Sequence, residues 1–192
     1  MSEQQKQEYH LNQDEKKALL TVARCAIERA VIGTQKEIPD YDMPVLEEQR
    51  GAFVTIHNQS ELRGCIGYVV GKRPLKEAVE EMAQAAALRD SRFKPVAASE
   101  LSEIDLEISV LSPLREIEDV NEIEVGTHGL MIRAGMYSGL LLPQVAAEHN
   151  WDRETFLQYT CMKAGLYKEA WKDENVSLSV FSAQVFSEKD MF

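Results

Sequence analysis

The sequence predicts an α+β fold, and two patterns of hydrophobic residues carry this expectation. Segments with apolar residues at every second position, as in strands, come in pairs around short polar turns. Longer segments with apolar residues at every third or fourth position, as in helices, are interspersed with those pairs. Hairpins with interspersed helices favour antiparallel or mixed sheets over a doubly wound parallel sheet. The 192 residues suffice for one domain with its own hydrophobic core.

A long first helix is predicted over residues 12–32. Asn12 and Glu15 have the spacing of a capping box, in which each of the two side chains accepts a backbone N–H at the start of a helix. Gly33 suits the end of that helix. Residues 33–50 then form a connection long enough either to border a site or to wrap around the surface.

The next unit is predicted to be strand, strand, helix. Residues 52–57 and 62–70 alternate as strands do, and the polar residues 58–61 between them have the length of a hairpin turn. Pro74 suits the first turn of the following helix. That helix carries one stripe of apolar residues, formed by Leu75, Ala78, Val79, Met82 and Ala86.

This unit recurs later in the chain. Residues 129–134 and 139–142 repeat the hairpin around Gly135, and Pro143 begins a helix as Pro74 does. A gap-free overlay gives three identities, which place Gly51 on Gly129, Ser60 on Ser138 and Leu62 on Leu140. Three identities leave both an internal duplication and chance open.

Two further strands and one further helix are predicted. Residues 104–111 alternate as a strand with one solvated face, and residues 176–186 alternate as one long final strand. Asp152 can cap a helix that runs through Lys163.

Charge and hydropathy exclude several classes of protein. With 32 acidic and 21 basic residues, the formal net charge is −11, which repels a phosphate backbone, so we expect no nucleic-acid partner. The first ten residues are polar, without the apolar segment of a secretion signal, and no stretch is long and apolar enough to span a membrane. We therefore expect a cytoplasmic protein.

The cysteines and histidines predict no metal centre. The three cysteines, Cys25, Cys65 and Cys161, are an odd number at wide spacings, so they are expected to be reduced thiols. The four histidines lack the spacing of metal ligands, and the chain has no nucleotide-binding or phosphate-binding glycine motif. We therefore expect neither a metal nor another cofactor.

The segment Leu62-Arg-Gly-Cys-Ile-Gly67 is the strongest candidate for a site. In a regular strand, Arg63 and Cys65 project from one face and Leu62 and Ile66 from the other. A guanidinium beside a thiol favours the thiolate, which is the reactive form of a nucleophile. Glycines within a strand, here Gly64 and Gly67, indicate a bulge or the close approach of a ligand or another backbone.

Plainer interpretations remain open for this segment. Cys65 can instead be a small buried residue of a core strand, with Arg63 reaching solvent. Cys25 and Cys161 lie on or beside the apolar stripes of predicted helices, and we expect both in the core.

Two other groups could join Cys65. Asp90 and Arg92 follow the second helix, where they can grip a carboxylate or phosphate, place Asp90 against Arg63, or form a structural ion pair. His128 lies between two glycines and is a natural base for a thiol, although it can equally be a turn residue.

The segment of residues 62–67 resembles the signature hexapeptide of the AMMECR-type domain family. Further segments fall in the order typical of that family, namely Gly51–Thr55, Asp90–Phe93, Glu107–Leu111, Val125–Leu130, Leu141–Gln144 and Lys163–Leu166. The resemblance implies a single domain over residues 1–192, with a larger and a smaller lobe built from repeated strand-strand-helix units, and a polar tail at residues 1–10. In bacteria it suggests the member known as AmmeMemoRadiSam system protein A, which occurs alongside a Memo-like protein and a radical-SAM protein.

Two functional hypotheses follow. In the first, the protein is an enzyme or enzyme component in which Cys65 is the nucleophile in a cleft between the lobes. Arg63 activates the thiol, His128 deprotonates it, and Gly64, Gly67, Asp90 and Arg92 contact the substrate. In the second, the protein is a non-catalytic adaptor for the Memo-like and radical-SAM partners.

Overall fold

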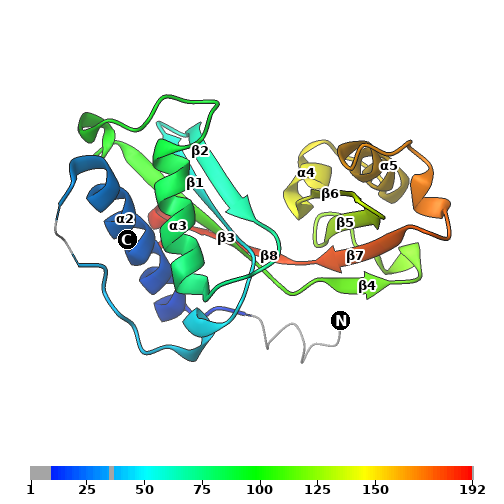
Figure 1. The fold of residues 1–192 in the computed structure, drawn as a ribbon, viewed down its shortest axis with the longest axis horizontal. Coiled ribbons are helices and arrows are strands. Elements are labelled where there is room, and N and C mark those ends of the chain that lie inside the picture. The colour runs from blue at the N-terminus through cyan, green and yellow to red at the C-terminus, as the bar shows by residue number, and fades with distance from the viewer. Residues whose placement is uncertain (1–9, 35–36, 192) are drawn as a thin grey trace. The chain divides into compact units, whose positions relative to one another are not determined.

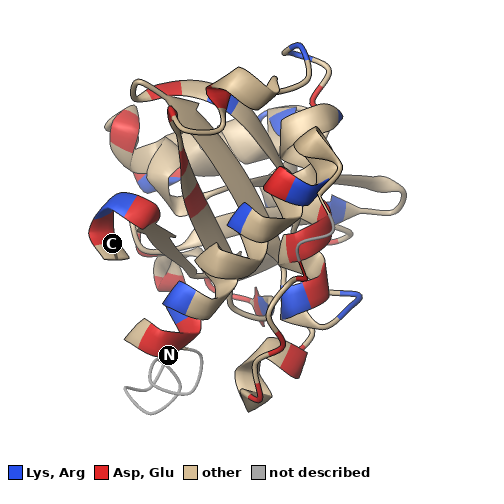
Figure 2. Cartoon of the chain, turned by 90° about the vertical axis from the view of Figure 1, so that its left-hand side faces the viewer, with Lys and Arg blue, Asp and Glu red and all other residues tan. Residues whose placement is uncertain are grey.

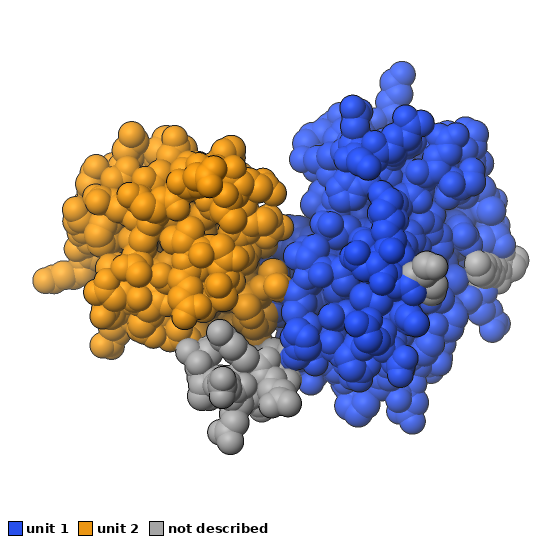
Figure 3. Space-filling view, turned by 180° about the vertical axis from the view of Figure 1, so that it is seen from behind, with its two compact units in different colours: residues 1–111, 184–192 blue, residues 112–183 orange. Residues whose placement is uncertain are grey.

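A computed structural model describes residues 10–34 and 37–191, and it has the predicted α+β fold (Figure 1). Two compact units make up the chain (Figure 3). Unit 1 comprises residues 1–111 and 184–192, and unit 2 comprises residues 112–183. Among the described residues, no helix is long and apolar enough to cross a membrane.

Unit 1 is a four-stranded sheet with the strand order β2-β1-β3-β8, covered on one face by two helices (Figure 1). Its elements are α2 (Gln13–Ile32), η1 (Pro44–Glu47), β1 (Ala52–Asn58), β2 (Glu61–Tyr68), α3 (Leu75–Leu88), η2 (Ala98–Glu100), β3 (Ile104–Leu111), β8 (Ala183–Ser187) and α6 (Glu188–Met191). β1 pairs antiparallel with both β2 and β3.

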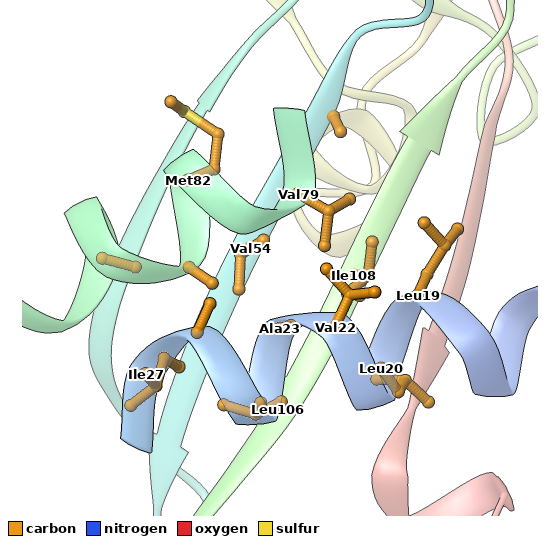
Figure 4. Packing of buried hydrophobic residues seen from close by; sticks show 14 of the residues in the cluster. Leu19, Leu20, Val22, Ala23, Ile27, Val54, Val79, Met82, Leu106 and Ile108 are labelled. Carbon is orange, nitrogen blue, oxygen red and sulfur yellow. The ribbon is translucent and has the colours of Figure 1, made fainter. Parts of the chain in front are cut away.

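The core of unit 1 forms where the apolar stripes of α2 and α3 meet the sheet (Figure 4). Val54 of β1 and Ile108 of β3 are fully buried against residues such as Val22 and Val79 of the two helices. α2 begins with the predicted capping box of Asn12 and Glu15. The helix ends at Gly33, whose φ of +66° lies in the left-handed region that glycine adopts freely.

Unit 2 is a second four-stranded sheet, with the strand order β4-β7-β5-β6. Its elements are β4 (Arg115–Ile117), η3 (Val120–Glu122), β5 (Gly129–Ala134), β6 (Tyr137–Leu141), α4 (Pro143–Glu148), α5 (Arg153–Lys163), η4 (Ala170–Lys172) and β7 (Ser177–Phe181). Asp152 caps α5 as predicted, by accepting the backbone N–H of Thr155 at 2.8 Å. Cys161 and the fully buried Phe156 belong to a core cluster of this unit.

The predicted long final strand is wrong in one respect. Residues 176–186 form two strands, β7 and β8, which belong to different sheets. The first part of the chain behaves in the same way, because β3 leads into β4 of the other sheet. Each sheet therefore holds a hairpin, β1–β2 or β5–β6, and a third strand beside it, β3 or β7. The fourth strand of each sheet directly follows the third strand of the other: β4 follows β3, and β8 follows β7. This matching order is what a duplicated unit predicts.

The two connections between the sheets are hydrogen-bonded to each other. The backbone N–H of Ser112, after β3, donates to the carbonyl of Ser182, after β7, at 2.9 Å. The N–H of Ser182 donates in turn to Oγ of Ser112 at 3.0 Å. Ser112 is buried, so these bonds satisfy polar groups that are removed from water.

Candidate functional site

A bulge in β2 determines which way the side chains around Cys65 point. The pairing of β1 with β2 shifts by one residue between Ile56–Gly64 and His57–Leu62, which makes Arg63 an extra residue in β2. One extra residue reverses the face of everything beyond it, because side chains alternate along a strand. Leu62, predicted to share the packed face with Ile66, is therefore 43% exposed, and that part of the prediction is wrong.

Cys65 lies on the face of the sheet opposite α2 and α3. It is directly opposite Thr55 of β1, and both residues are partly exposed. The Thr55 hydroxyl donates a hydrogen bond to Sγ of Cys65 at 3.2 Å. The thiol is thus neither sealed in the core nor fully in solvent, and a neutral hydroxyl fixes its position.

Arg63 is held by a carboxylate. Its Nε and Nη2 donate to the two oxygens of Glu100 at 2.8 and 3.1 Å, and its Nη1 donates to the carbonyl of Lys94 at 2.8 Å. The hydrogen bond to Glu100 raises the pKa of Arg63, and the same bond lowers the pKa of Glu100. In the structure, Arg63 fastens the segment after α3 to β2.

Asp90 and Arg92 hold the peptide group of Cys65 from outside the sheet. Oδ2 of Asp90 accepts the Cys65 N–H at 2.9 Å, and Nη2 of Arg92 donates to the Cys65 carbonyl at 3.2 Å. Arg92 also donates to Asp90 through Nε at 2.9 Å and Nη2 at 2.7 Å. β2 is an edge strand, so these two side chains take the place of a neighbouring strand at Cys65.

The electrostatics of this pair follow from its hydrogen bonds. Only 4% of the Asp90 side chain is exposed, against 55% for Arg92. The hydrogen bond from Arg92, and further bonds from the N–H groups of Cys65 and Arg92, hold the pKa of Asp90 well below its usual range. The pKa of Arg92 is raised, chiefly by its hydrogen bond to Asp90. Arg92 is therefore a cation whose guanidinium contacts the Cys65 carbonyl.

The two glycines lie where other parts of the chain come close. A Cβ atom on Gly64 would stand 2.3 Å from the carbonyl oxygen of Ala86 in α3, and one on Gly67 would stand 2.4 Å from that of Ala52. The close approach that these glycines indicated is therefore that of the protein's own backbone. Substrate contact at Gly64 and Gly67 stays a prediction.

His128 belongs to unit 2, whereas Cys65 belongs to unit 1. It is only 3% exposed, and its Nδ1 accepts the backbone N–H of Glu124 at 3.2 Å. Burial lowers its pKa, which favours the neutral imidazole. The proposed transfer of a proton from Cys65 to His128 stays a prediction.

The two other thiols lie where the sequence placed them. Cys25 and Cys161 are buried, as predicted, and burial raises the pKa of Cys161. Within residues 10–34 and 37–191, no three side chains of the metal-binding types come together. A pocket of about 390 Å³ beside the β1–β2 turn is lined by Arg63 and Leu62 but not by Cys65; its other lining residues are Asn58, Gln59, Glu61 and Glu103.

Sequence reasoning missed Thr55 and Glu100, and the bulge explains the first omission. The regular register of this hairpin would place Cys65 opposite Val54, on the core face, and only the extra residue brings it opposite Thr55. Glu100 lies 37 residues after Arg63, and no local pattern links the two. The only indication of this pairing in the sequence was that a carboxylate follows the helix after Arg63.

The fold and the site define a class of protein: two α+β units that exchange their fourth strands, with a cysteine on the edge strand of the first sheet held by an Asp–Arg pair. The AMMECR1 family model matches residues 20–186. The chain is similar to a protein of Methanothermobacter thermautotrophicus, with 44% identity over 93% of this chain and 96% of that protein.

Two further relatives point the same way. A protein of Sulfolobus acidocaldarius is 43% identical, over 93% of this chain and 83% of the other. The crystal structure of an uncharacterised protein from Pyrococcus horikoshii matches with a TM-score of 0.78 and 42% identity, over 89% and 90% of the two chains. The chain belongs to the AMMECR1 family.

Proposed function

We propose that the protein is an enzyme or enzyme component that uses the thiol of Cys65 as its nucleophile. The observation that carries this proposal is the position of the thiol, which is partly exposed while its peptide group is held on both sides by Asp90 and Arg92. A nucleophile needs access together with a fixed orientation. We assign to Arg92 the activating role that the sequence suggested for Arg63, because Arg92 contacts the Cys65 carbonyl at 3.2 Å, whereas the hydrogen bonds of Arg63 go to Glu100 and to the segment after α3.

The proposed step is a displacement at an electrophilic carbon. Cys65 releases its thiol proton to a base or to water, and Sγ forms a bond to the carbon. The bond from that carbon to its leaving group breaks, and the leaving group departs with the bonding electrons. The product is a covalent adduct on Cys65, which a partner enzyme or a second reactant then resolves.

Alkylation of the three cysteines tests this proposal within one molecule. The rate of labelling by iodoacetamide is followed by mass spectrometry for each cysteine of the folded protein, with a neutral model thiol, N-acetylcysteine amide, at the same pH. We expect Cys65 to react faster than the model thiol, whereas the buried Cys25 and Cys161 stay protected until the protein unfolds. Labelling of Cys65 no faster than the model thiol would contradict a nucleophilic role.

A non-catalytic adaptor is the second candidate, and a specific observation favours it. Arg63, Asp90 and Glu100 all direct their charged groups to partners within the chain. The segment of residues 62–67 would then shape a docking surface for the Memo-like and radical-SAM proteins that the family resemblance suggests. In that case Cys65→Ala leaves co-purification with a Memo-like protein intact and no turnover is lost.

Nucleic acid remains the partner with the least support. Acidic and basic residues are interspersed on the side of the chain that Figure 2 shows, and the net charge is −11. Such a surface attracts a polyanion only through a local cluster of cations.

A further inference from the structure

We infer that the Cys65 site takes an anionic electrophile, one that carries a carboxylate or phosphate group beside its reactive carbon. This inference rests on the proposed nucleophilic role of Cys65 and names the class of its substrate. The cation that would bind the anionic group is Arg92, assisted by Arg89 and Lys94.

The first support is the Nη1 group of the Arg92 guanidinium. Its Nε and Nη2 are used by Asp90 and by the Cys65 carbonyl, whereas its Nη1 has no acceptor within residues 10–34 and 37–191. More than half of the Arg92 side chain is exposed. With Nε and Nη2 held by these bonds, Nη1 is the donor group that is oriented and left for an anion.

The second support is the charge of the segment around Arg92. Residues 89–94 hold three cations, Arg89, Arg92 and Lys94, against the single carboxylate of Asp90, which gives a local charge of 3 − 1 = +2 on a chain of net charge −11. Arg89 and Lys94 are exposed, and neither forms an ion pair with another described residue. Arg63 adds nothing to this excess, because Glu100 neutralises it.

Two carboxylates that face the same side of the sheet as Cys65 limit the attraction of an anion to this site. Glu107 of β3 lies opposite Thr55 of β1, and is two strands farther from the edge of the sheet than Cys65. Asp105 lies opposite His57 and is bound to Lys189 at 3.5 Å. Both carboxylates are beyond β1 from Cys65. At Cys65 itself, the Arg92 guanidinium and the Asp90 carboxylate both contact the backbone, so these two charges offset each other and the positive excess comes from Arg89 and Lys94.

A pair of alkylating reagents that differ in charge tests the inference. Iodoacetate is an anion and iodoacetamide is neutral. With either reagent, the thiolate sulfur bonds to the methylene carbon and iodide leaves. We expect the ratio of the iodoacetate rate to the iodoacetamide rate to be about three- to tenfold higher for Cys65 than for N-acetylcysteine amide at ~0.1 M salt. The excess should shrink as salt is added, since both cation and reagent are exposed to solvent.

Variants identify the cations responsible. Arg92→Gln should bring the ratio close to that of the model thiol, but it also leaves Asp90 without its partner. Arg89→Gln and Lys94→Gln remove the same charge without breaking any hydrogen bond of a described side chain, and each should lower the ratio in part. Lys17→Gln is the matched control, because Lys17 is an exposed residue of α2 on the opposite face of the sheet and should leave the ratio unchanged.

The two possible failures can be told apart. If Cys65 reacts with iodoacetamide no faster than the model thiol, the nucleophilic role itself is wrong. If it reacts rapidly with iodoacetamide but shows no preference for iodoacetate, or if Lys17→Gln lowers the ratio as much as Lys94→Gln does, then only the inference of an anionic substrate is overturned.

Discussion

At the scale of single residues, Asp90 decides the geometry at Cys65. It is a buried carboxylate that accepts hydrogen bonds from two backbone N–H groups and from Arg92. Charged acceptors of this kind satisfy donors that an edge strand would otherwise expose. The side chain therefore connects the stability of unit 1 to the position of the candidate nucleophile.

We predict that Asp90→Asn lowers the free energy of unfolding by about 1–3 kcal/mol at neutral pH, because the amide loses the charge that Arg92 and the backbone N–H groups stabilise. The folded pKa of Asp90 is lowered from 3.8, so its stabilising effect is complete above the unfolded pKa and is lost as pH falls through the folded pKa. The difference between wild type and variant should therefore shrink from about pH 5 to about pH 2.

Urea unfolding at several pH values measures this difference, with Asp152→Asn as the control. Asp152 caps α5, and asparagine caps a helix about as well as aspartate, so that variant should lose little stability. An Asp90→Asn variant as stable as wild type at neutral pH would show that Asp90 has no structural role at Cys65.

Gly64 offers a second test at this scale. Gly64→Ala would bring a methyl group within 2.3 Å of the backbone of Ala86, and backbone cannot swing aside as a flexible side chain does. We expect a loss of about 1–3 kcal/mol in thermal or urea unfolding. Gly33→Ala, where no atom lies within 4 Å and only the positive φ is strained, should lose about 1 kcal/mol. A Gly64→Ala variant as stable as wild type would contradict the close packing of α3 on β2.

At the scale of secondary-structure elements, the helices were the most predictable part of this chain. α2 and α5 begin at the capping residues that their sequences show, Asn12 and Asp152, because a cap acts within one turn. The glycines beside Cys65 indicated a bulge as one of two alternatives, but its position at Arg63 and the three-residue strand β4 were not predictable. The glycines do not fix which residue of β2 is extra, and β4 depends on its pairing with β7, far along the chain.

The β1–β2 turn is an element with conformational strain that substitution can relieve. Gln59 and Ser60 have φ values of +51° and +70°, which residues other than glycine adopt at a cost. We predict that Ser60→Gly stabilises the protein by about 0.5–1 kcal/mol. Ser138, which the sequence overlay equated with Ser60, lies instead within β6, so Ser138→Gly should destabilise the protein by a similar amount.

Thermal unfolding of the two serine variants measures both changes in stability, a gain for Ser60→Gly and a loss for Ser138→Gly. The opposite signs are expected because the first hairpin is longer than the second: β1 ends at Asn58, whereas β5 ends at Ala134. Destabilisation by Ser60→Gly would mean that the serine side chain stabilises the turn more than its backbone conformation costs.

At the scale of the whole molecule, the exchange of strands means that neither half of the sequence completes a sheet alone. Unit 1 needs β8, which comes from the end of the chain, and several bonds fix that segment. Glu188 accepts hydrogen bonds from Arg24 of α2 and from the Leu106 N–H of β3, the latter at 3.0 Å. The sequence predicted one continuous strand over residues 176–186, because β7 and β8 share a single alternating pattern. Only the sheet topology divides them.

Two phenylalanines five residues apart should therefore report on different units. Phe186 of β8 is 2% exposed and packs in the core of unit 1, whereas the ring of Phe181 in β7 packs over Gly129 of β5 in unit 2. We predict that each Phe→Ala variant loses about 3–5 kcal/mol of local stability. Hydrogen exchange followed by mass spectrometry should show faster exchange in α2 and β3 for Phe186→Ala, and in β5 and β7 for Phe181→Ala. If both variants accelerate exchange equally in both units, the two sheets unfold as one cooperative block, and the exchanged strands couple them more strongly than two separate cores would.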